Sequence, residues 1–186
     1  MNEYPKAVSR IAVSYLILFF SFKLGTFECI PNWIAYWMIY NTLETIAVYE
    51  KSVMLLRSLT ILLIGYELIS WLLSAFGVMI DQSFLTIFFL ALSLYLHYQL
   101  LTNLADIAQR HQCSQAKRIR QLRDARTLFS TISVLPISWN MTGMIIFIAI
   151  GLIISIWLMR TLYTYSYDEK LLVRKQAQIA RAMESS

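Results

Sequence analysis

Four ionisable residues stand inside otherwise apolar stretches of this chain: Glu44, Arg57, Glu67 and His97. A charge surrounded by apolar groups is costly, so such residues usually face a protein interior or a pathway. A buried carboxylate must find a partner or take up a proton. These four residues are therefore the candidates for an intramembrane functional site that handles protons or cations.

Glu44 and Arg57 lie on either side of a short polar link between two apolar segments. If both segments are helical, the two residues sit at similar depth, because each helical residue adds about 1.5 Å. We therefore expect an ion pair between them. The pair is either a structural clip between neighbouring helices or part of a functional site.

Glu67 lies near the middle of its apolar segment, beside Tyr66. It is either a proton or cation site, or a protonated carboxyl that donates a hydrogen bond to a neighbouring helix. His97 stands in the next apolar segment and could be its partner. By itself, a histidine at such a position is more often a hydrogen-bonded packing residue than a ligand.

Two further patterns allow a transport interpretation. Aromatic residues at Trp33, Trp37 and Tyr40 lead to Glu44 at helical spacing, which fits either an interfacial belt with bundle packing or an aromatic-lined ligand path. The pairs Ile-Gly and Trp-Leu also recur at one spacing, at 64–72 and 150–158. Inverted repeats occur in transporters, although such matches arise easily in apolar sequence.

The elements that must position these residues are predicted by composition. The 186 residues are 58% hydrophobic and 15% charged, against about 45–50% and about 25% in soluble domains. A bilayer can accommodate that much apolar surface. We predict an all-α, polytopic transmembrane helix bundle with about six spans. The predicted spans are 7–24, 33–49, 53–80, 84–104, 128–139 and 141–158.

The number of spans depends on residues 128–159, which carry no charge. One helix of this length would be about 48 Å long, against a hydrocarbon core of about 30 Å, and would give five spans. Pro136, Asn140 and Gly143 interrupt the stretch and favour two helices. Residues 128–139 then span the membrane, re-enter it or lie at its interface.

Charge predicts the orientation. Residues 105–127 form a basic segment, which the positive-inside rule keeps in the cytoplasm. With six spans, Lys23 alone among the 16 Lys and Arg residues lies outside. We therefore expect both termini in the cytoplasm, in the plasma membrane of a bacterium. Residues 1–162 form the transmembrane domain, and residues 163–186 a helical cytoplasmic tail that begins with interfacial tyrosines and a capping pair, Ser166 and Glu169.

The basic segment also predicts a lipid contact. Its later part has apolar residues at helical spacing, which indicates an amphipathic helix at the membrane surface that continues into the next span. The apolar positions are Ile119, Leu122, Ala125 and Phe129. We expect the basic side chains to bind anionic headgroups of the inner leaflet. These side chains are Lys117, Arg118, Arg120 and Arg123.

Enzyme signatures are missing from the sequence. It has no H-E-x-x-H, no G-x-S-x-G and no phosphate-binding loop, so we assign no catalytic residue and no cofactor. His111 and Cys113 are too few for a metal site. The basic charge lies beside apolar segments, so we expect lipid rather than nucleic acid as its partner.

Two functions remain open on these grounds. The first is a non-enzymatic subunit or scaffold of a membrane complex, which fits short outer loops and basic amphipathic elements. Other membrane proteins or further copies of the chain would be its partners. The alternative is a small transporter or permease component that uses the intramembrane carboxylates.

Overall fold

The chain forms an all-α bundle in a computed structural model that describes residues 3–19, 23–24, 27–28, 31–77, 83–134 and 140–184. Within these residues the helices are α1 (Glu3–Phe19), α2 (Asn32–Ala47), α3 (Leu55–Ala75), α4 (Ser83–Arg110), α5 (Ala116–Val134) and α6 (Met141–Glu184). The 3-10 helix η1 (Lys51–Met54) leads into α3, and strand β1 (Lys23–Leu24) pairs with β2 (Phe27–Glu28). The predicted fold class is confirmed.

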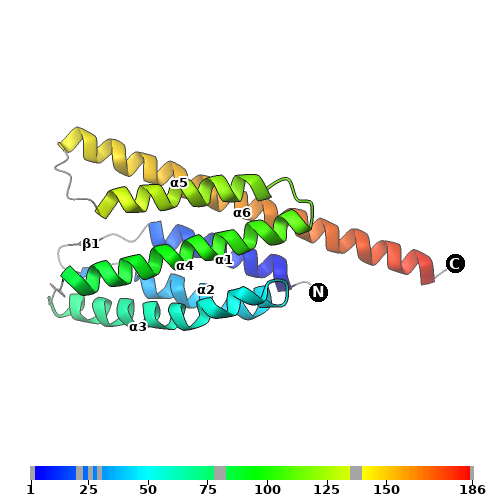
Figure 1. Cartoon of the computed structure of the whole chain (residues 1–186), viewed down its shortest axis with the longest axis horizontal. Helices are drawn as coiled ribbons and strands as arrows, with labels where there is room; N and C mark the ends of the chain where they lie inside the picture. The colour runs from blue at the N-terminus through cyan, green and yellow to red at the C-terminus, as the bar shows by residue number, and fades with distance from the viewer. Residues whose placement is uncertain are drawn as a thin grey trace.

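The helices lie side by side along one long axis, and α6 extends well past the others (Figure 1). At one end Tyr4 packs on Tyr49, with ring centroids 4.4 Å apart, and also contacts His111 and Tyr165. We call this the polar end. It gathers the start of α1, the α2–α3 link, the α4–α5 link and the later part of α6. The sequence predicted these four segments on one side, and which side of a membrane they occupy stays a prediction.

Three helical segments are long and apolar enough to cross a membrane: Lys51–Ala75, Phe84–Arg110 and Met141–Leu171. The helices α1 and α2 have 17 and 16 residues. They are therefore about 24–26 Å long, somewhat shorter than a hydrocarbon core of about 30 Å. Composition thus supports three spans directly, and a membrane crossing by the other three helices stays a prediction.

The stretch predicted as one or two helices is divided. The helix α5 ends at Val134 and α6 begins at Met141, so the five-span alternative with one long helix is wrong. The Asn140 side chain accepts a hydrogen bond of 2.7 Å from the backbone N–H of Gly143. This bond satisfies one of the amide groups that the first helical turn leaves unpaired. Pro136 lies outside the described residues.

Other boundaries differ from the prediction. Span one does not continue as a helix to residue 24, because Lys23 and Leu24 pair as a strand with Phe27 and Glu28, which engages their backbone groups. Span three does not reach residue 80 as a helix. It ends at Ala75, and Gly77 adopts a φ of 74°, a left-handed conformation that terminates helices and suits glycine.

The predicted basic segment is not a single loop. Its first residues continue α4 to Arg110, and α5 begins at Ala116 after a short turn in which Gln112 has a φ of 55°. As predicted, the amphipathic part of α5 is continuous with the apolar residues that follow. Its apolar side packs on α4, and Ile119 is fully buried. The position of this helix at a membrane surface stays a prediction.

The core lies around α1, which packs between α2 and α6. Val8, Ile11 and Tyr15 are fully buried on it. By contrast, the first half of α6 exposes large apolar side chains, such as Ile145 and Ile153 at 59% and 60%. An apolar surface of this extent calls for lipid or a protein partner.

Candidate functional site

A cluster of aromatic and polar side chains from α1, α2 and α4 surrounds His97. The His97 Nδ1 atom lies 3.3 Å from the Tyr15 hydroxyl, and the two ring centroids are 5.2 Å apart. Tyr36 stacks against His97 at 5.8 Å, and its hydroxyl lies 2.8 Å from Ser93 Oγ. The imidazole therefore lies between two aromatic rings, Tyr15 of α1 and Tyr36 of α2. Both tyrosines are buried.

Arg126 of α5 joins this cluster. Its guanidinium carbon lies 4.7 Å from the centroid of the Tyr15 ring, a distance typical of a cation–π contact. It is also within electrostatic range of Tyr36 and His97. Arg126 was not among the site residues predicted from the sequence. A signal was present, because Arg126 is the last charged residue before the uncharged stretch, but sequence spacing does not show toward which neighbour it turns.

Glu67 is half-buried on α3 and lies within electrostatic range of Tyr36. Beside it, Tyr66 stacks on Phe89 of α4, with centroids 3.9 Å apart and planes 12° apart. Tyr36 therefore stacks on His97 and lies near Glu67, the two residues that the sequence suggested as partners. The use of Glu67 for protons or cations stays a prediction.

The predicted ion pair between Glu44 and Arg57 is confirmed, with Oε1 and Nη1 2.6 Å apart. The Arg57 Nε–H also donates to the Tyr40 hydroxyl at 2.9 Å. The carboxylate and guanidinium side chains are 67% and 37% exposed. Trp37 stacks on Tyr40 and is itself 52% exposed. This part of the aromatic pattern therefore lies on the outer surface of α2 rather than along an interior path.

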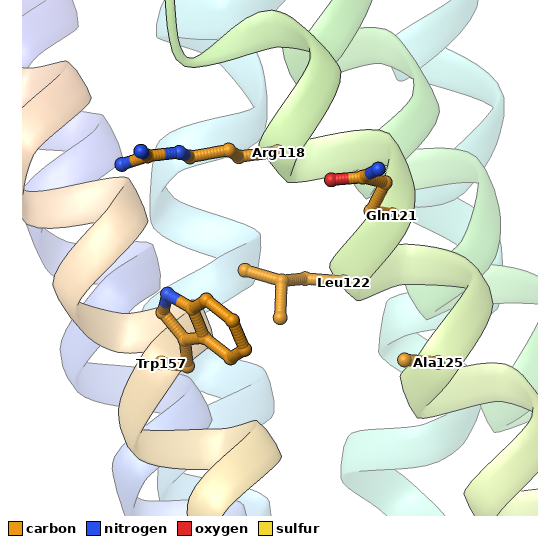
Figure 2. Close-up of a pocket in the computed structure, with 5 residues that line it drawn as sticks. All are labelled: Arg118, Gln121, Leu122, Ala125 and Trp157. Carbon is orange, nitrogen blue, oxygen red and sulfur yellow. The ribbon is translucent and has the colours of Figure 1, made fainter.

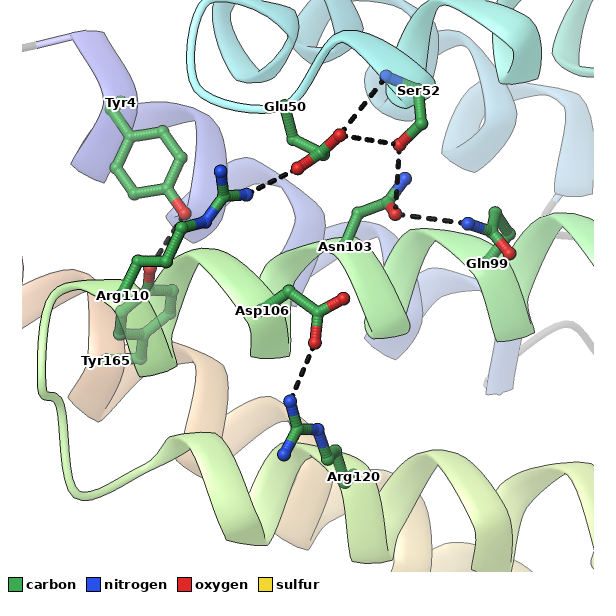
Figure 3. A network of polar contacts seen from close by, with 9 residues as sticks. All are labelled: Tyr4, Glu50, Ser52, Gln99, Asn103, Asp106, Arg110, Arg120 and Tyr165. Carbon is green, nitrogen blue, oxygen red and sulfur yellow. Dashed lines mark hydrogen bonds and ion pairs between the residues drawn. The ribbon is translucent and has the colours of Figure 1, made fainter.

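A hydrogen-bonded network ties the start of α3 to α4 at the polar end (Figure 3). Glu50 pairs with Arg110, and its Oε1 lies 3.0 Å from Ser52 Oγ. Ser52 Oγ is also 3.3 Å from Asn103 Oδ1. The hydrogen bond from Arg110 lowers the pKa of the Glu50 carboxyl, because it stabilises the ionised form.

A second set of contacts joins α6 to α1. The hydroxyls of Tyr4 and Tyr165 are 2.7 Å apart, and Ser166 Oγ donates to the Pro5 carbonyl at 2.6 Å. Because α6 is continuous through these residues, the capping pair predicted at Ser166 is wrong. The hydroxyl instead satisfies a carbonyl of another helix.

The α4–α5 turn contacts the same part of α6. His111 Nδ1 lies 2.8 Å from Oε1 of the buried Glu169, and the Cys113 thiol lies 3.6 Å from Asp168 Oδ2. Burial raises the pKa of the Cys113 thiol. No group of three or more His, Cys, Asp or Glu within the described residues is arranged to hold a metal ion. The two contacts join the α4–α5 turn to α6.

The basic residues predicted to bind headgroups separate into two sets. Arg120 pairs with Asp106 of α4 at 2.7 Å. Arg123 donates to Thr102 Oγ1 at 2.8 Å and lies over the Tyr98 ring, 4.3 Å from its centroid. Both arginines are therefore engaged by α4.

Lys117 and Arg118 form the other set and are exposed. Lys117 projects away from the buried Ile119, whereas Arg118 lies on the same side of α5 as Leu122, four residues further along the helix. The binding of headgroups by any of the four basic residues stays a prediction, and these two have their charges available on the surface.

No protein family, curated protein or solved structure matches the chain.

Proposed function

We propose that the chain is a non-enzymatic subunit or scaffold of a membrane protein complex. The observation that carries the proposal is the outward position of the Glu44–Arg57 pair. Both residues belong to segments predicted to span the membrane, and both side chains are substantially exposed. Trp37 stands beside them on the same surface.

Charges at membrane depth usually face a bundle interior, because contact with hydrocarbon is costly. An outward ion pair is therefore expected to be covered by another protein. The surrounding aromatic residues fit this view, since Trp, Tyr and Arg are enriched where proteins make energetically important contacts. The partner is another membrane protein or a second copy of the chain.

The test is a charge reversal, Glu44→Arg together with Arg57→Glu. The double variant keeps an ion pair within the chain but reverses the pattern that a partner meets. Like charges then face each other across the interface with an unchanged partner, which is either a different protein or, for a self-associating chain, a wild-type copy mixed with the reversed one. We expect this association to weaken by at least about tenfold. The measurement is the mass of the complex extracted from membranes in mild detergent, by native mass spectrometry and light scattering.

The matched control reverses the exposed pair Glu3 and Lys6, whose charged atoms are 3.2 Å apart at the polar end. This variant should leave the complex intact, because the pair lies at the start of α1, outside the predicted spans. A wild-type chain that is monomeric after gentle extraction would overturn the proposal. Equal persistence of the complex in both reversed variants would also overturn it.

A small transporter or permease component is the second candidate. It is favoured by the cluster in which Arg126 and His97 meet Tyr15 and Tyr36, with Glu67 in electrostatic range. Glu67→Gln keeps the shape of the side chain and removes its charge. In a transporter it should abolish substrate flux or growth complementation while the protein still purifies intact. Normal function at normal thermal stability would remove this candidate.

A further inference from the structure

A groove of about 170 Å³ lies between α5 and α6 (Figure 2). Its lining residues are Arg118, Gln121, Leu122, Ala125 and Trp157. At a greater distance from the polar end the two helices are in close contact. There Phe129 of α5 stacks on Phe147 of α6, with ring centroids 4.2 Å apart. The groove opens about two turns closer to the polar end.

The groove is amphiphilic. The Arg118 guanidinium reaches across it toward α6, and the indole nitrogen of Trp157 points to the same part of the groove (Figure 2). Gln121 adds an amide at the rim, while Leu122 and Ala125 line the side of α5. Cationic and N–H donors above an apolar wall match an anionic group joined to a hydrocarbon chain.

We propose that this groove binds one anionic phospholipid. The phosphate accepts hydrogen bonds from Arg118 and from the Trp157 indole, and the adjoining carbons lie against Leu122 and Ala125. The volume corresponds to roughly five or six water molecules. That is room for a phosphate and a few carbons, with the rest of the acyl chain running along the exposed apolar surface of α6.

Charge and position both favour this occupant. In contrast to Arg120 and Arg123, Arg118 has no ion pair within the described residues, so its charge is available. Trp157 lies at the end of predicted span 141–158, and tryptophan is enriched at such membrane boundaries. The guanidinium is therefore at the level where lipid phosphates are found. The inference does not depend on the proposed scaffold function.

The test uses the full chain in detergent, titrated with phosphatidylglycerol or with phosphatidylcholine of the same acyl chains. Binding is measured by native mass spectrometry and by the rise in thermal unfolding temperature. We expect phosphatidylglycerol to bind more tightly. Arg118→Gln should weaken it by about tenfold, a loss typical of one charge-assisted hydrogen bond.

Lys117→Gln is the matched control, because it removes the same charge from the adjacent exposed residue, which does not line the groove. It should change the affinity by less than about twofold. Arg118→Lys should retain part of the binding, since lysine keeps the charge but not the planar fork. Trp157→Phe should weaken binding while keeping the apolar wall.

Several outcomes would overturn the inference. Equal losses in the Arg118 and Lys117 variants would indicate attraction to the whole basic surface rather than a site. Equal binding of the two lipids would exclude recognition of the headgroup charge. If inorganic phosphate alone gave the same thermal shift, the groove would be a site for free anions. Melting without lipid checks that each variant remains folded.

Discussion

The helices α3 and α6 carry the same short pattern, with a glycine six residues before a tryptophan, yet their surroundings differ. A Cβ atom added to Gly65 of α3 would meet nothing within 4 Å. At Gly151 of α6, the same atom would lie 2.5 Å from Cζ of Phe129. The first glycine is incidental to packing, and the second allows an aromatic ring to approach the helix backbone.

The tryptophans differ in the same way. Trp71 packs edge-on against Trp33 of α2, with centroids 6.4 Å apart. Trp157 is 54% exposed and lines the α5–α6 groove. The shared spacing therefore reflects apolar composition rather than a common role, and it gives little support to an inverted repeat of the transporter type. In apolar helices, the neighbour decides what a residue does.

The starts of the two helical segments form a second contrast. Glu50 precedes η1 and α3, and its carboxylate accepts a hydrogen bond from the Ser52 N–H. Asn140 precedes α6 and accepts a hydrogen bond from the Gly143 N–H. Each side chain thus caps the first turn of the helical segment that follows it. The Glu50 cap is ionisable, and the Asn140 cap is not. The two segments should therefore respond differently to pH.

The largest effect is expected at the glycines. Gly151→Ala should destabilise the protein by about 1–3 kcal/mol, because the new methyl group forces Phe129 away from its stack on Phe147. Gly65→Ala should be neutral or stabilise by up to about 1 kcal/mol, because alanine favours the helix and meets open space. Thermal unfolding in detergent measures both.

A double variant sharpens this comparison. In the presence of Phe129→Leu, which removes the ring, Gly151→Ala should lower the stability of the protein much less than it does alone. Gly65→Ala should have the same effect with or without that change. If the two glycine substitutions proved equally costly, the close approach of α5 and α6 would not explain the role of Gly151.

A smaller effect is expected from the caps. The folded-state pKa of Glu50 is lowered, so its contribution is present above its unfolded value of 4.5 and is lost as pH falls through the folded value. Acidification from neutral pH should therefore weaken the start of α3. The loss should be less than about 1 kcal/mol, since the Glu50–Arg110 pair is partly exposed.

Two variants separate this effect from general acid destabilisation. Glu50→Gln should flatten the part of the pH dependence that Glu50 causes. Asn140→Ala should lower stability by about 1 kcal/mol at every pH, because its amide does not titrate in this range. The measurement is the thermal midpoint between pH 7 and pH 3. An unchanged pH profile in Glu50→Gln would contradict the assignment.

Sequence reasoning succeeded where residues close in the chain decide the outcome. The link between α2 and α3 is short, and Glu44 and Arg57 lie a similar number of residues before and after it. Their pairing could therefore be predicted from the sequence. The break before α6 followed from Asn140, whose side chain bonds only three residues ahead. It failed at Ser166, because its hydroxyl bonds to Pro5, which is remote in sequence.

Sequence alone determined that the chain is helical and apolar, where most helices break, and which charged residues need an explanation. Tertiary structure alone decided that Arg126 reaches Tyr15, that Arg120 and Arg123 are engaged by α4, and that Arg118 faces a groove. The physical reason is that periodicity fixes the height and relative angle of side chains on one helix. The rotation of each helix toward its neighbours is set by packing between helices, which no single segment encodes.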